Sequence, residues 1–400
     1  MSPAPASAPA NLRLRVISAI AEVDAASWDA CANPSDQHHP YNPFISYDFL
    51  HSLEASGSAT ARTGWQPRHL LMEDADGSIL GVVPCYLKSH SRGEYVFDRG
   101  WAEAYERAGG QYYPKLQVSV PFTPATGRRL LLRPGPQAEA VRTSLTAGLI
   151  ELCKRHEASS VHVTFMPEAE CQALIEHGFL HRTDQQFRWE NAGYGTFEAF
   201  LEALSARKRK TIRRERREAL APGISVYALT GSELTEEVWD TFFEFYMETG
   251  SRKWGRPYLT RNFYTLMGER MADKIVLIMA KRAGRFIAGA INFIGSDTLF
   301  GRHWGAVEHH PFLHFELCYY RAIDFAIARG LKRVEAGAQG EHKLARGYLP
   351  VTTHSAHYIA DPGLRRAIAD YLARERAYVE SASEELAAMA PFRKDLVEQD

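Results

Sequence analysis

Hydrophobic and polar positions follow the same order in two distant segments of the chain. Leu145 to Met166 begins with apolar residues at helical spacing, passes a polar turn and ends in an apolar run, Val161 to Phe165. Phe315 to Ala338 repeats this order, and Gly330 supplies a left-handed stop for its helix. The apolar stripe of that helix consists of Phe315, Cys318, Tyr319, Ala322, Ile323, Ala326 and Ile327. Each segment therefore predicts a helix followed by a strand.

A predicted pair of strands precedes each of these segments, and each pair turns at polar and glycine residues. The pairs are His69 to Met72 with Ile79 to Tyr86, and Ile275 to Lys281 with Phe286 to Ile294. Hairpin, further strand, helix and strand thus occur twice, about 200 residues apart, which predicts a mixed α/β fold built from two similar domains. We expect a disordered tail at residues 1–12, a first domain at 13–190 and a second domain at 191–400.

The composition is that of a globular protein. Of 400 residues, 45% are apolar and 24% are charged, and 47 basic side chains balance 48 acidic ones. This balance gives no reason to expect attraction of the whole chain to nucleic acid or anionic lipid, although a local patch is compatible with it. The longest apolar runs, such as Ile275 to Ala280, have the length of strands, so no membrane span is predicted. Five cysteines without a C-x-x-C pair, and a tail without signal-peptide features, predict a cytoplasmic protein.

Four longer segments resemble one group of proteins, the FemAB-like predicted N-acyltransferases. The segments are NPFISYDFLHSLEASG (Asn42 to Gly57), YYPKLQVSVPFTPATGRRLL (Tyr112 to Leu131), HFELCYYRAIDFAI (His314 to Ile327) and EAGAQGEHKLARGYLPVTTHSAH (Glu335 to His357). The order of elements, and the helix ending LIEHGF before a strand, also resemble the GNAT acyltransferase fold. The resemblance implies two tandem GNAT-like domains that transfer an acyl or aminoacyl group to an amine. It also implies kinship with the enzymes that attach amino acids to peptidoglycan precursors.

The turn after the central strand of the second copy bears on which molecule donates the transferred group. In acetyl-CoA enzymes of this fold, a glycine-rich turn after the central strand binds the pyrophosphate through backbone N–H groups. Here the stretch after the strand Leu299 to Trp304 contains a single glycine, Gly305. This departs from the CoA-binding pattern and agrees with the Fem branch, whose donors are aminoacyl-tRNAs. Aminoacyl-tRNA is therefore the favoured co-substrate and acyl-CoA the less favoured one, with no bound cofactor.

A basic segment of the chain is a candidate binding site for tRNA, which is a polyanion. It lies on a helix predicted over residues 196–220, which has an apolar side at Phe197, Phe200, Leu201 and Leu204. The candidate phosphate-binding residues are Arg207, Lys208, Lys210, Arg213, Arg214 and Arg217. The alternative is a solvated helical face whose charge Glu215 and Glu218 partly compensate.

The second candidate cluster is GAQGEHKLARGY, Gly337 to Tyr348, which follows the predicted strand Arg333 to Ala336. Open α/β sheets place ligands at the carboxyl ends of strands, and glycines permit close backbone approach. The candidates are Glu341 or His342 as proton acceptor, Lys343 and Arg346 for a carboxylate or phosphate, and Gln339 as a further substrate contact. The alternative is a loop held by its own ion pairs.

A histidine-rich stretch, RHWGAVEHHPFLHFE, supplies the third set. Its candidates are His303 and Glu316 for proton handling, and Trp304, His309 and His314 for substrate contact. A metal site is disfavoured because Pro311 interrupts any helix through His310 and His314, and no H-E-x-x-H motif occurs. The alternative is that these histidines have structural roles, with their hydrogen bonds made inside the protein.

In the first half, Tyr113 and Lys115 are candidate substrate contacts. Pro114, Pro121 and Pro124 surround them, which favours a loop or sheet edge over a buried central strand. Such a loop could wall a cleft between the domains, or it could simply pack the face between them. No nucleophile elbow occurs, so direct attack by an amine is the expected mechanism. The rivals to an N-acyltransferase are a non-catalytic ligand-binding protein on the same fold and a metal-dependent hydrolase.

Overall fold

Two β-sheets organise the computed structural model, which describes residues 12–393 apart from 37, 222, 255–256 and 338–339, and without the side chains of residues 252–254 and 341. The smaller sheet has the order β1-β3-β4-β7 and the larger has the order β10-β11-β12-β13-β14-β9-β15-β8-β6-β5-β2. The strands of the smaller sheet are β1 (Arg13–Ile17), β3 (His69–Glu73), β4 (Ile79–Val83) and β7 (Leu131–Leu132). Those of the larger sheet are β2 (Trp65–Pro67), β5 (Cys85–Lys88), β6 (Lys115–Val118), β8 (Ser160–Met166), β9 (Leu180–Glu190), β10 (Ile224–Leu229), β11 (Ile275–Arg282), β12 (Arg285–Ile294), β13 (Thr298–Ala306), β14 (Arg333–Glu335) and β15 (Leu349–Ile359).

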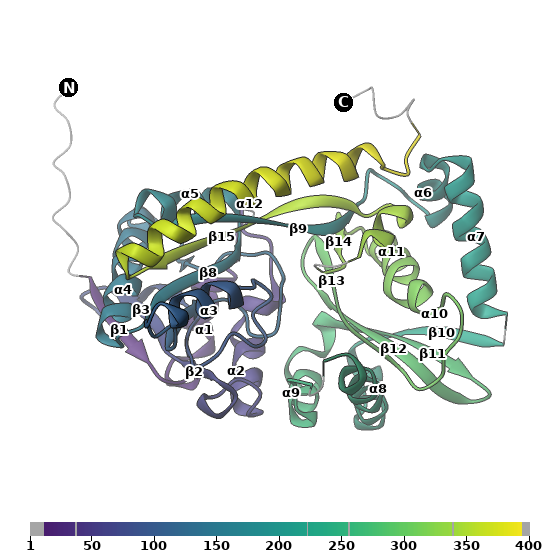
Figure 1. Cartoon of the computed structure of the whole chain (residues 1–400). Helices are drawn as coiled ribbons and strands as arrows, with labels where there is room; N and C mark the ends of the chain where they lie inside the picture. Colours follow the sequence, from purple (N-terminus) through teal and green to yellow (C-terminus); the bar gives the residue numbers. More distant parts are fainter. Residues whose placement is uncertain (1–11, 37, 222, 255–256, 338–339, 394–400) are drawn as a thin grey trace, which may run out of the picture.

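Helices surround both sheets, with the first half of the chain on the left of Figure 1 and most of the second half on the right. In the first half they are α1 (Ala25–Ala32), α2 (Tyr47–Ala55), α3 (Arg99–Arg107), α4 (Ala138–Arg155) and α5 (Glu168–Glu176). In the second half they are α6 (Phe197–Ala203), α7 (Ala206–Leu220), α8 (Glu236–Trp254), α9 (Arg261–Met271), α10 (Leu313–Phe315), the π-helix η6 (Glu316–Tyr320), α11 (Arg321–Ala328), the 3-10 helix η7 (Glu341–Arg346) and α12 (Pro362–Ala388). Short 3-10 turns are η1 (Ile20–Glu22), η2 (Pro43–Ile45), η3 (Ala61–Thr63), η4 (Gly231–Glu233) and η5 (Ala272–Lys274).

The predicted repeat is confirmed. Both hairpins, β3–β4 and β11–β12, are antiparallel. Both later strand pairs, β6–β8 and β13–β14, are parallel and are joined through a helix, as a crossover between parallel strands requires. The first hairpin bends at Arg68 and Pro84, so that its strands leave the smaller sheet and continue as β2 and β5 of the larger one.

Strand β15 joins the two halves of the chain. Although it follows the second copy of the repeat, it pairs with β9 on one side and with β8 of the first half on the other. Figure 1 shows α12 lying along β9 and β15, and a two-pronged ion pair between Arg182 and Glu375 ties the helix to β9. One sheet therefore runs through both halves, and the division at residue 190 stays a prediction.

Strands β11 to β14 have apolar cores on both faces. The face that packs against α8, α9 and the first half carries Ile291 and Phe300, and we call it the inner face. The opposite face packs against α6, α7 and α11 and carries Leu299 and Val334, and we call it the outer face. Successive side chains of a strand alternate between the two, so the register assigns each residue to a face.

Two local predictions were wrong. The helix predicted over 196–220 is two helices, α6 and α7, that meet at Leu204 and Ser205. The segment between Pro114 and Pro121 was expected to be a loop or edge, yet β6 is buried and pairs with β5 and β8. The prolines flank this strand, where a missing N–H costs no ladder bond, instead of interrupting it.

Candidate active site

The strands of the second copy separate at a defined point. Strands β13 and β14 pair at three positions, and the last pair is Phe300 with Glu335. Strand β14 ends there, whereas β13 continues to Ala306 with β12 as its partner. We call the region between Gly301–Trp304 of β13 and the chain from Glu335 to Gly337 the wedge. Its position at the carboxyl end of β14 is where open α/β sheets bind ligands.

A β-bulge shapes one side of the wedge. Asn292 of β12 pairs with Gly301, but Ala290 pairs with Trp304, so β13 contains one extra residue at Arg302 and His303. Such a bulge leaves a residue unpaired and re-aims neighbouring side chains. Accordingly, Arg302 and His303 both line one small inner-face cavity.

Arg302 ties the bulge to the first half of the chain. Its Nη2 donates a hydrogen bond to the backbone oxygen of Phe122 at 2.6 Å. Burial lowers the pKa of Arg302, and the nearby Tyr95 opposes that shift. Tyr95 and Phe122 adopt left-handed backbone conformations, with φ of 61° and 60°, which bulky residues adopt only where their surroundings hold them. Strained first-half backbone therefore faces the wedge.

Glu335 stands at the mouth of the wedge on the inner face. Its neighbour Val334 belongs to the outer core, and its β9 partner is Arg188. Burial raises the pKa of the Glu335 carboxyl to about 7, against the influence of Arg188, the Thr126 backbone N–H, Arg333 and Arg302. The sequence analysis did not single out Glu335 as a site residue. The sequence did offer one indication of it: Glu335 lies on the predicted strand that directly precedes the candidate cluster Gly337 to Tyr348.

On the outer face the structure brings three predicted residues together. The ring of His314 lies 5.2 Å from that of Trp304 and 6.3 Å from that of His342, between centroids. Nε2 of His342 is 2.9 Å from the hydroxyl of Tyr319. Burial, then Arg346 and Lys343, lower the pKa of His342, so its imidazole is neutral at pH 7. Gln339 and the side chain of Glu341 lie outside the described residues.

Lys343 and Arg346 point into the protein. Lys343 is 3% exposed, its Nζ donates to the backbone oxygen of Gly337 at 2.9 Å, and burial lowers its pKa to about 8. Arg346 is 6% exposed, and its Nη2 lies 2.8 and 2.9 Å from the two carboxylate oxygens of Glu215. Its guanidinium also lies 3.5 Å over the ring of Phe315. The anion that Arg346 holds in the structure is therefore the side chain of Glu215, and a substrate contact of Arg346 stays a prediction.

Glu316 and His303, the candidates for proton handling, both lie in buried surroundings. Glu316 is fully buried, and its oxygens accept from Arg216 at 3.1 Å and Arg321 at 2.7 Å, so it belongs to an internal ion-pair cluster. His303 packs against Tyr246, and burial lowers its pKa to about 3, which keeps the ring neutral. His309 is exposed at the turn after β13.

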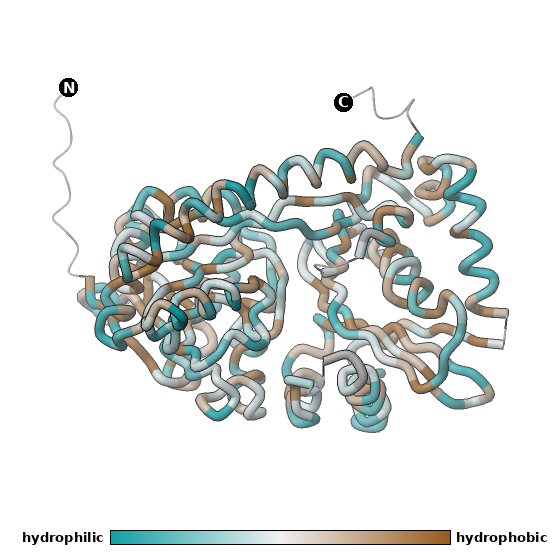
Figure 2. The backbone as a smooth tube through the Cα atoms, viewed as in Figure 1, coloured by the Kyte–Doolittle hydropathy of each residue, from teal (hydrophilic) through white to brown (hydrophobic). Residues whose placement is uncertain are grey.

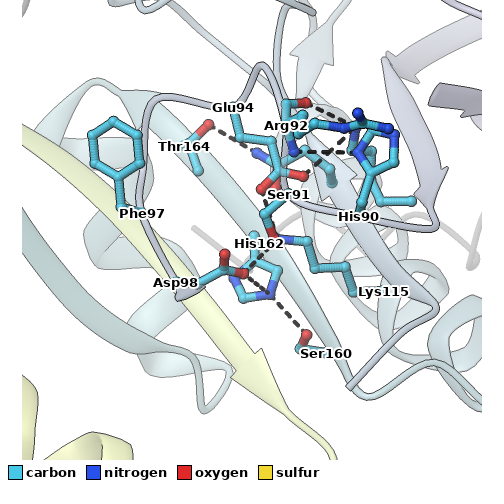
Figure 3. A network of polar contacts seen from close by, with 12 residues as sticks. His90, Ser91, Arg92, Glu94, Phe97, Asp98, Lys115, Ser160, His162 and Thr164 are labelled. Atoms are coloured by element: carbon cyan, nitrogen blue, oxygen red, sulfur yellow. Dashed lines mark hydrogen bonds and ion pairs between the residues drawn. The ribbon is translucent and has the colours of Figure 1, made fainter. Parts of the chain in front are cut away.

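Lys115 lies in a buried network (Figure 3) instead of a cleft wall. It is fully buried in β6, donates to Glu94 at 2.6 Å and pairs with Asp98. Tyr113 is 2.8 Å from the hydroxyl of Ser91. Both acidic partners of Lys115 are internal, and the substrate contact expected of it stays a prediction.

The corresponding end of the first copy is closed. There the last parallel pair is Val118 with Val163, and the buried side chain of Arg129 follows it. Arg129 donates to the backbone oxygens of Thr164 at 2.8 Å and Ala125 at 2.7 Å, bridging the two chain segments that would otherwise separate.

Helix α7 carries the basic segment along the outer face, and Figure 2 shows it as largely hydrophilic. Arg213 pairs with Glu198, and Arg214 lies 3.8 Å from Glu218. Arg216, which belongs to the same basic run, reaches inward to Glu316 and Asp324. Within the described part of the chain, the basic residues of α7 without an ion pair include Arg207, Lys208, Lys210 and Arg217.

A cleft of about 790 Å³ opens between the two halves, at the end of α2, η3, the loop after β5 and the segment before α9. Arg62 and Arg92 line it and have no ion pair with any described residue, whereas Arg261 is held by Glu236 and Asp240. Its apolar wall includes Phe122, which stacks on Tyr258 at 4.9 Å. Since Phe122 also accepts the hydrogen bond from Arg302, one residue links this cleft to the wedge.

The described residues contain neither a candidate metal cluster nor a candidate membrane-spanning helix. No group of three or more histidine, cysteine, aspartate or glutamate residues among them could hold a metal ion. No helix in the same ranges is both long and apolar enough to cross a membrane.

Two copies of one α/β unit, with an open strand pair in the second, form a tandem GNAT-like fold. The chain belongs to the FemAB-like family, whose model, described as peptidoglycan biosynthesis/recognition, matches residues 19–394. The protein is accordingly a transferase of acyl or aminoacyl groups that acts on an amine acceptor, and the fold class expected from the sequence is confirmed.

Two solved structures, FemX and a conserved protein from Bacteroides thetaiotaomicron, support this fold. FemX is 13% identical with a TM-score of 0.55, over 87% of this chain and 98% of FemX. A conserved protein of unknown function from Bacteroides thetaiotaomicron is 12% identical with a TM-score of 0.50, over 86% of this chain and 99% of that one. A tandem GNAT protein from the clavulanic acid biosynthesis pathway is 13% identical with a TM-score of 0.46, over 88% and 99%. Comparison with curated proteins by sequence finds no match.

Proposed function

We propose that the protein transfers an aminoacyl group from aminoacyl-tRNA to an amine of a peptidoglycan-type peptide, in the wedge of the second copy. The observation that carries this proposal is the arrangement of the two faces. The basic helix α7 lies on the outer face, the arginine-lined cleft lies on the inner side, and the wedge between β13 and β14 separates them. Donor and acceptor can then approach the same point from opposite sides.

The donor side is supported by charge. Arg207, Lys208, Lys210 and Arg217 are available to phosphates, since no described residue neutralises them. The turn after β13 has only Gly305, so it offers little backbone for a CoA pyrophosphate. His342 with Tyr319, and Lys343, are our proposed contacts for the donor end that carries the reactive ester. A charged tRNA would also place the reaction in the cytoplasm.

The acceptor side is supported by the cleft. A volume of about 790 Å³ admits an elongated peptide, and Arg62 and Arg92 offer unpaired charge for its carboxylate or phosphate groups. The family description, peptidoglycan biosynthesis/recognition, supports this class of acceptor. The cleft meets the bulge through Phe122, so a bound peptide can extend its amine towards the wedge.

The chemistry requires one bond exchange. The free amine attacks the ester carbonyl, the new C–N bond forms, and the C–O bond to the tRNA ribose breaks. The backbone N–H groups of the bulge at Arg302 and His303 are our proposed donors to the oxyanion that forms between these steps.

Mass spectrometry tests the proposal directly. The protein is incubated with mixed aminoacyl-tRNAs or with acetyl-CoA, each with a lysine-containing muramyl pentapeptide or with free amino acids. We expect the mass of an aminoacyl residue on the pentapeptide with charged tRNA only. An acetyl adduct would instead identify CoA as the donor. The absence of any adduct, with melting temperatures that rise on ligand addition, would support the non-catalytic binding protein.

A further inference from the structure

Several buried carboxylates near the centre of the molecule have a cationic partner among the described residues, whereas Glu335 does not. Glu94 and Asp98 are held by Lys115, Glu215 by Arg346, and Glu316 by Arg216 and Arg321. Within the ranges that the structure describes, Glu335 forms no ion pair within 4.0 Å, and it is partly exposed. A carboxylate in this position keeps an oxygen available for a ligand.

Its charged surroundings come from several strands. Arg188 of β9 shares its register, Arg333 lies on β14 itself, Arg302 projects from the bulge of β13, and the buried Arg129 acts on it from the first half. The backbone N–H of Thr126 is the remaining polar group that faces it. These groups surround the carboxylate without neutralising it by direct contact, and they keep it on the inner face.

The position of Glu335 matches the path proposed for the amine. The residue ends β14 opposite Phe300, at the point where the strands part. Arg302, which acts on the Glu335 carboxyl, also donates to the backbone oxygen of Phe122, and Phe122 lines the cleft. An amine that extends from the cleft to the wedge therefore passes the carboxylate before it meets a donor ester from the outer face.

We propose that Glu335 is the catalytic base that takes the proton from the attacking amine. This inference rests on the proposed function. The acceptor enters as an ammonium ion, one proton passes to the Glu335 carboxylate, and the nitrogen lone pair forms the C–N bond. The ribose oxygen leaves with the electrons of the broken C–O bond and takes up a proton, and the second proton lost by nitrogen goes to solvent. The sum is ester plus ammonium giving amide, alcohol and one proton.

The chemical test is the pH dependence of single-turnover transfer. The probes are mixed aminoacyl-tRNAs and the lysine-containing muramyl pentapeptide, and the variants are Glu335→Gln and Glu335→Asp. General bases contribute about 10²–10⁴-fold, so E335Q should lose at least about 100-fold at pH 7. A lysine amine deprotonates unaided near pH 10.4, so the loss should shrink steadily towards that pH. E335D, which keeps the carboxylate, should retain part of the rate.

The control is Glu190→Gln. Glu190 lies on the neighbouring β9 and pairs with Arg188, so its loss disturbs the same arginines without touching the wedge. We expect wild-type rates from it, and a melting temperature for E335Q that shows a folded protein.

Three experimental outcomes would overturn the inference, and they can be told apart. A loss by the same factor at every pH would assign Glu335 a purely structural role and overturn the inference. Wild-type rates for E335Q would overturn it as well, while leaving the proposed function intact. If the wild-type protein transfers nothing from either donor, the proposed function fails and the inference fails with it.

Discussion

The guanidinium of Arg302 donates a 2.6 Å hydrogen bond to the backbone oxygen of Phe122, although the two residues are 180 positions apart. Arg302 belongs to the bulge that borders the wedge, and Phe122 belongs to the wall of the cleft. The bond therefore couples the surface that we assign to the acceptor with the strand that we assign to chemistry. Movement of the first-half loop at Phe122 would be transmitted directly to the bulge.

Replacing Arg302 should therefore impair turnover more than folding. Arg302→Lys keeps the positive charge but loses the planar guanidinium group. That group donates to the backbone oxygen of Phe122 and also acts on the carboxyl of Glu335. A hydrogen bond to a charged group is worth about 1.5–3 kcal/mol, which corresponds to a loss of about tenfold or more in kcat/KM. Steady-state kinetics with the pentapeptide would measure it, and a melting temperature within a few degrees of wild type would exclude unfolding. Unchanged kcat/KM would remove the coupling from the mechanism.

Helix α7 should make donor binding sensitive to salt. Each lost phosphate contact reduces the slope of log K against log salt by about 0.7–0.9. The double variant Lys210→Ala with Arg217→Ala should therefore bind aminoacyl-tRNA more weakly and with a slope shallower by about 1.4–1.8. Arg366→Ala with Arg374→Ala, which removes two exposed cations from α12, is the matched control. Equal slopes for the two double variants would contradict a donor site on α7.

The cleft should determine the affinity for the acceptor. Arg62→Ala and Arg92→Ala each remove a cation that no described carboxylate neutralises, and neither residue borders the wedge. We expect a KM for the pentapeptide that rises by about tenfold for each, with kcat nearly unchanged, because uniform binding is lost. Arg270→Ala is the control, since Arg270 pairs with Asp48 outside the cleft. If kcat falls and KM stays constant, the arginines act in the chemical step instead.

Arg346 and Glu215 should matter for stability. Both side chains are less than a tenth exposed, and Tyr320 also donates to Glu215. Removing one partner of a buried pair leaves an uncompensated charge, which costs about 3–5 kcal/mol. Arg346→Met should lower the free energy of unfolding by that order in urea titration. Arg285→Met breaks an exposed pair with Glu308 and should cost at most about 1 kcal/mol. Similar losses in both variants would mean that Arg346 is not held as the structure describes.

Local pattern predicted the repeated unit and the strand that precedes the cluster Gly337 to Tyr348, since periodicity and the glycine stop of α11 are properties of short segments. Local pattern could not predict which side chains distant in the sequence would contact each other. Arg346 meets Glu215 and Lys115 meets Asp98 only because sheet pairing brings separate strands and helices together. The same limit explains why Glu335 was missed, because its face and its lack of a close cation depend on β9 and β13. The identity of β15 as the strand that joins both halves has no local signature.

Glu335 should also make stability depend on pH in a direction opposite to that of most carboxylates. Burial raises its pKa from 4.5 to about 7, so the folded protein keeps a proton that the unfolded chain has released between these values. Stability from this residue is therefore present below about pH 4.5 and falls as pH rises to about 7. E335Q should unfold at a higher temperature than wild type at pH 8, by an amount worth about 1–3 kcal/mol, and the difference should vanish near pH 5. Thermal unfolding of E335Q, E190Q and wild type at both pH values would measure this. A variant that is less stable than wild type at pH 8 would show that the carboxylate is stabilised by its arginines, and that its pKa is not raised.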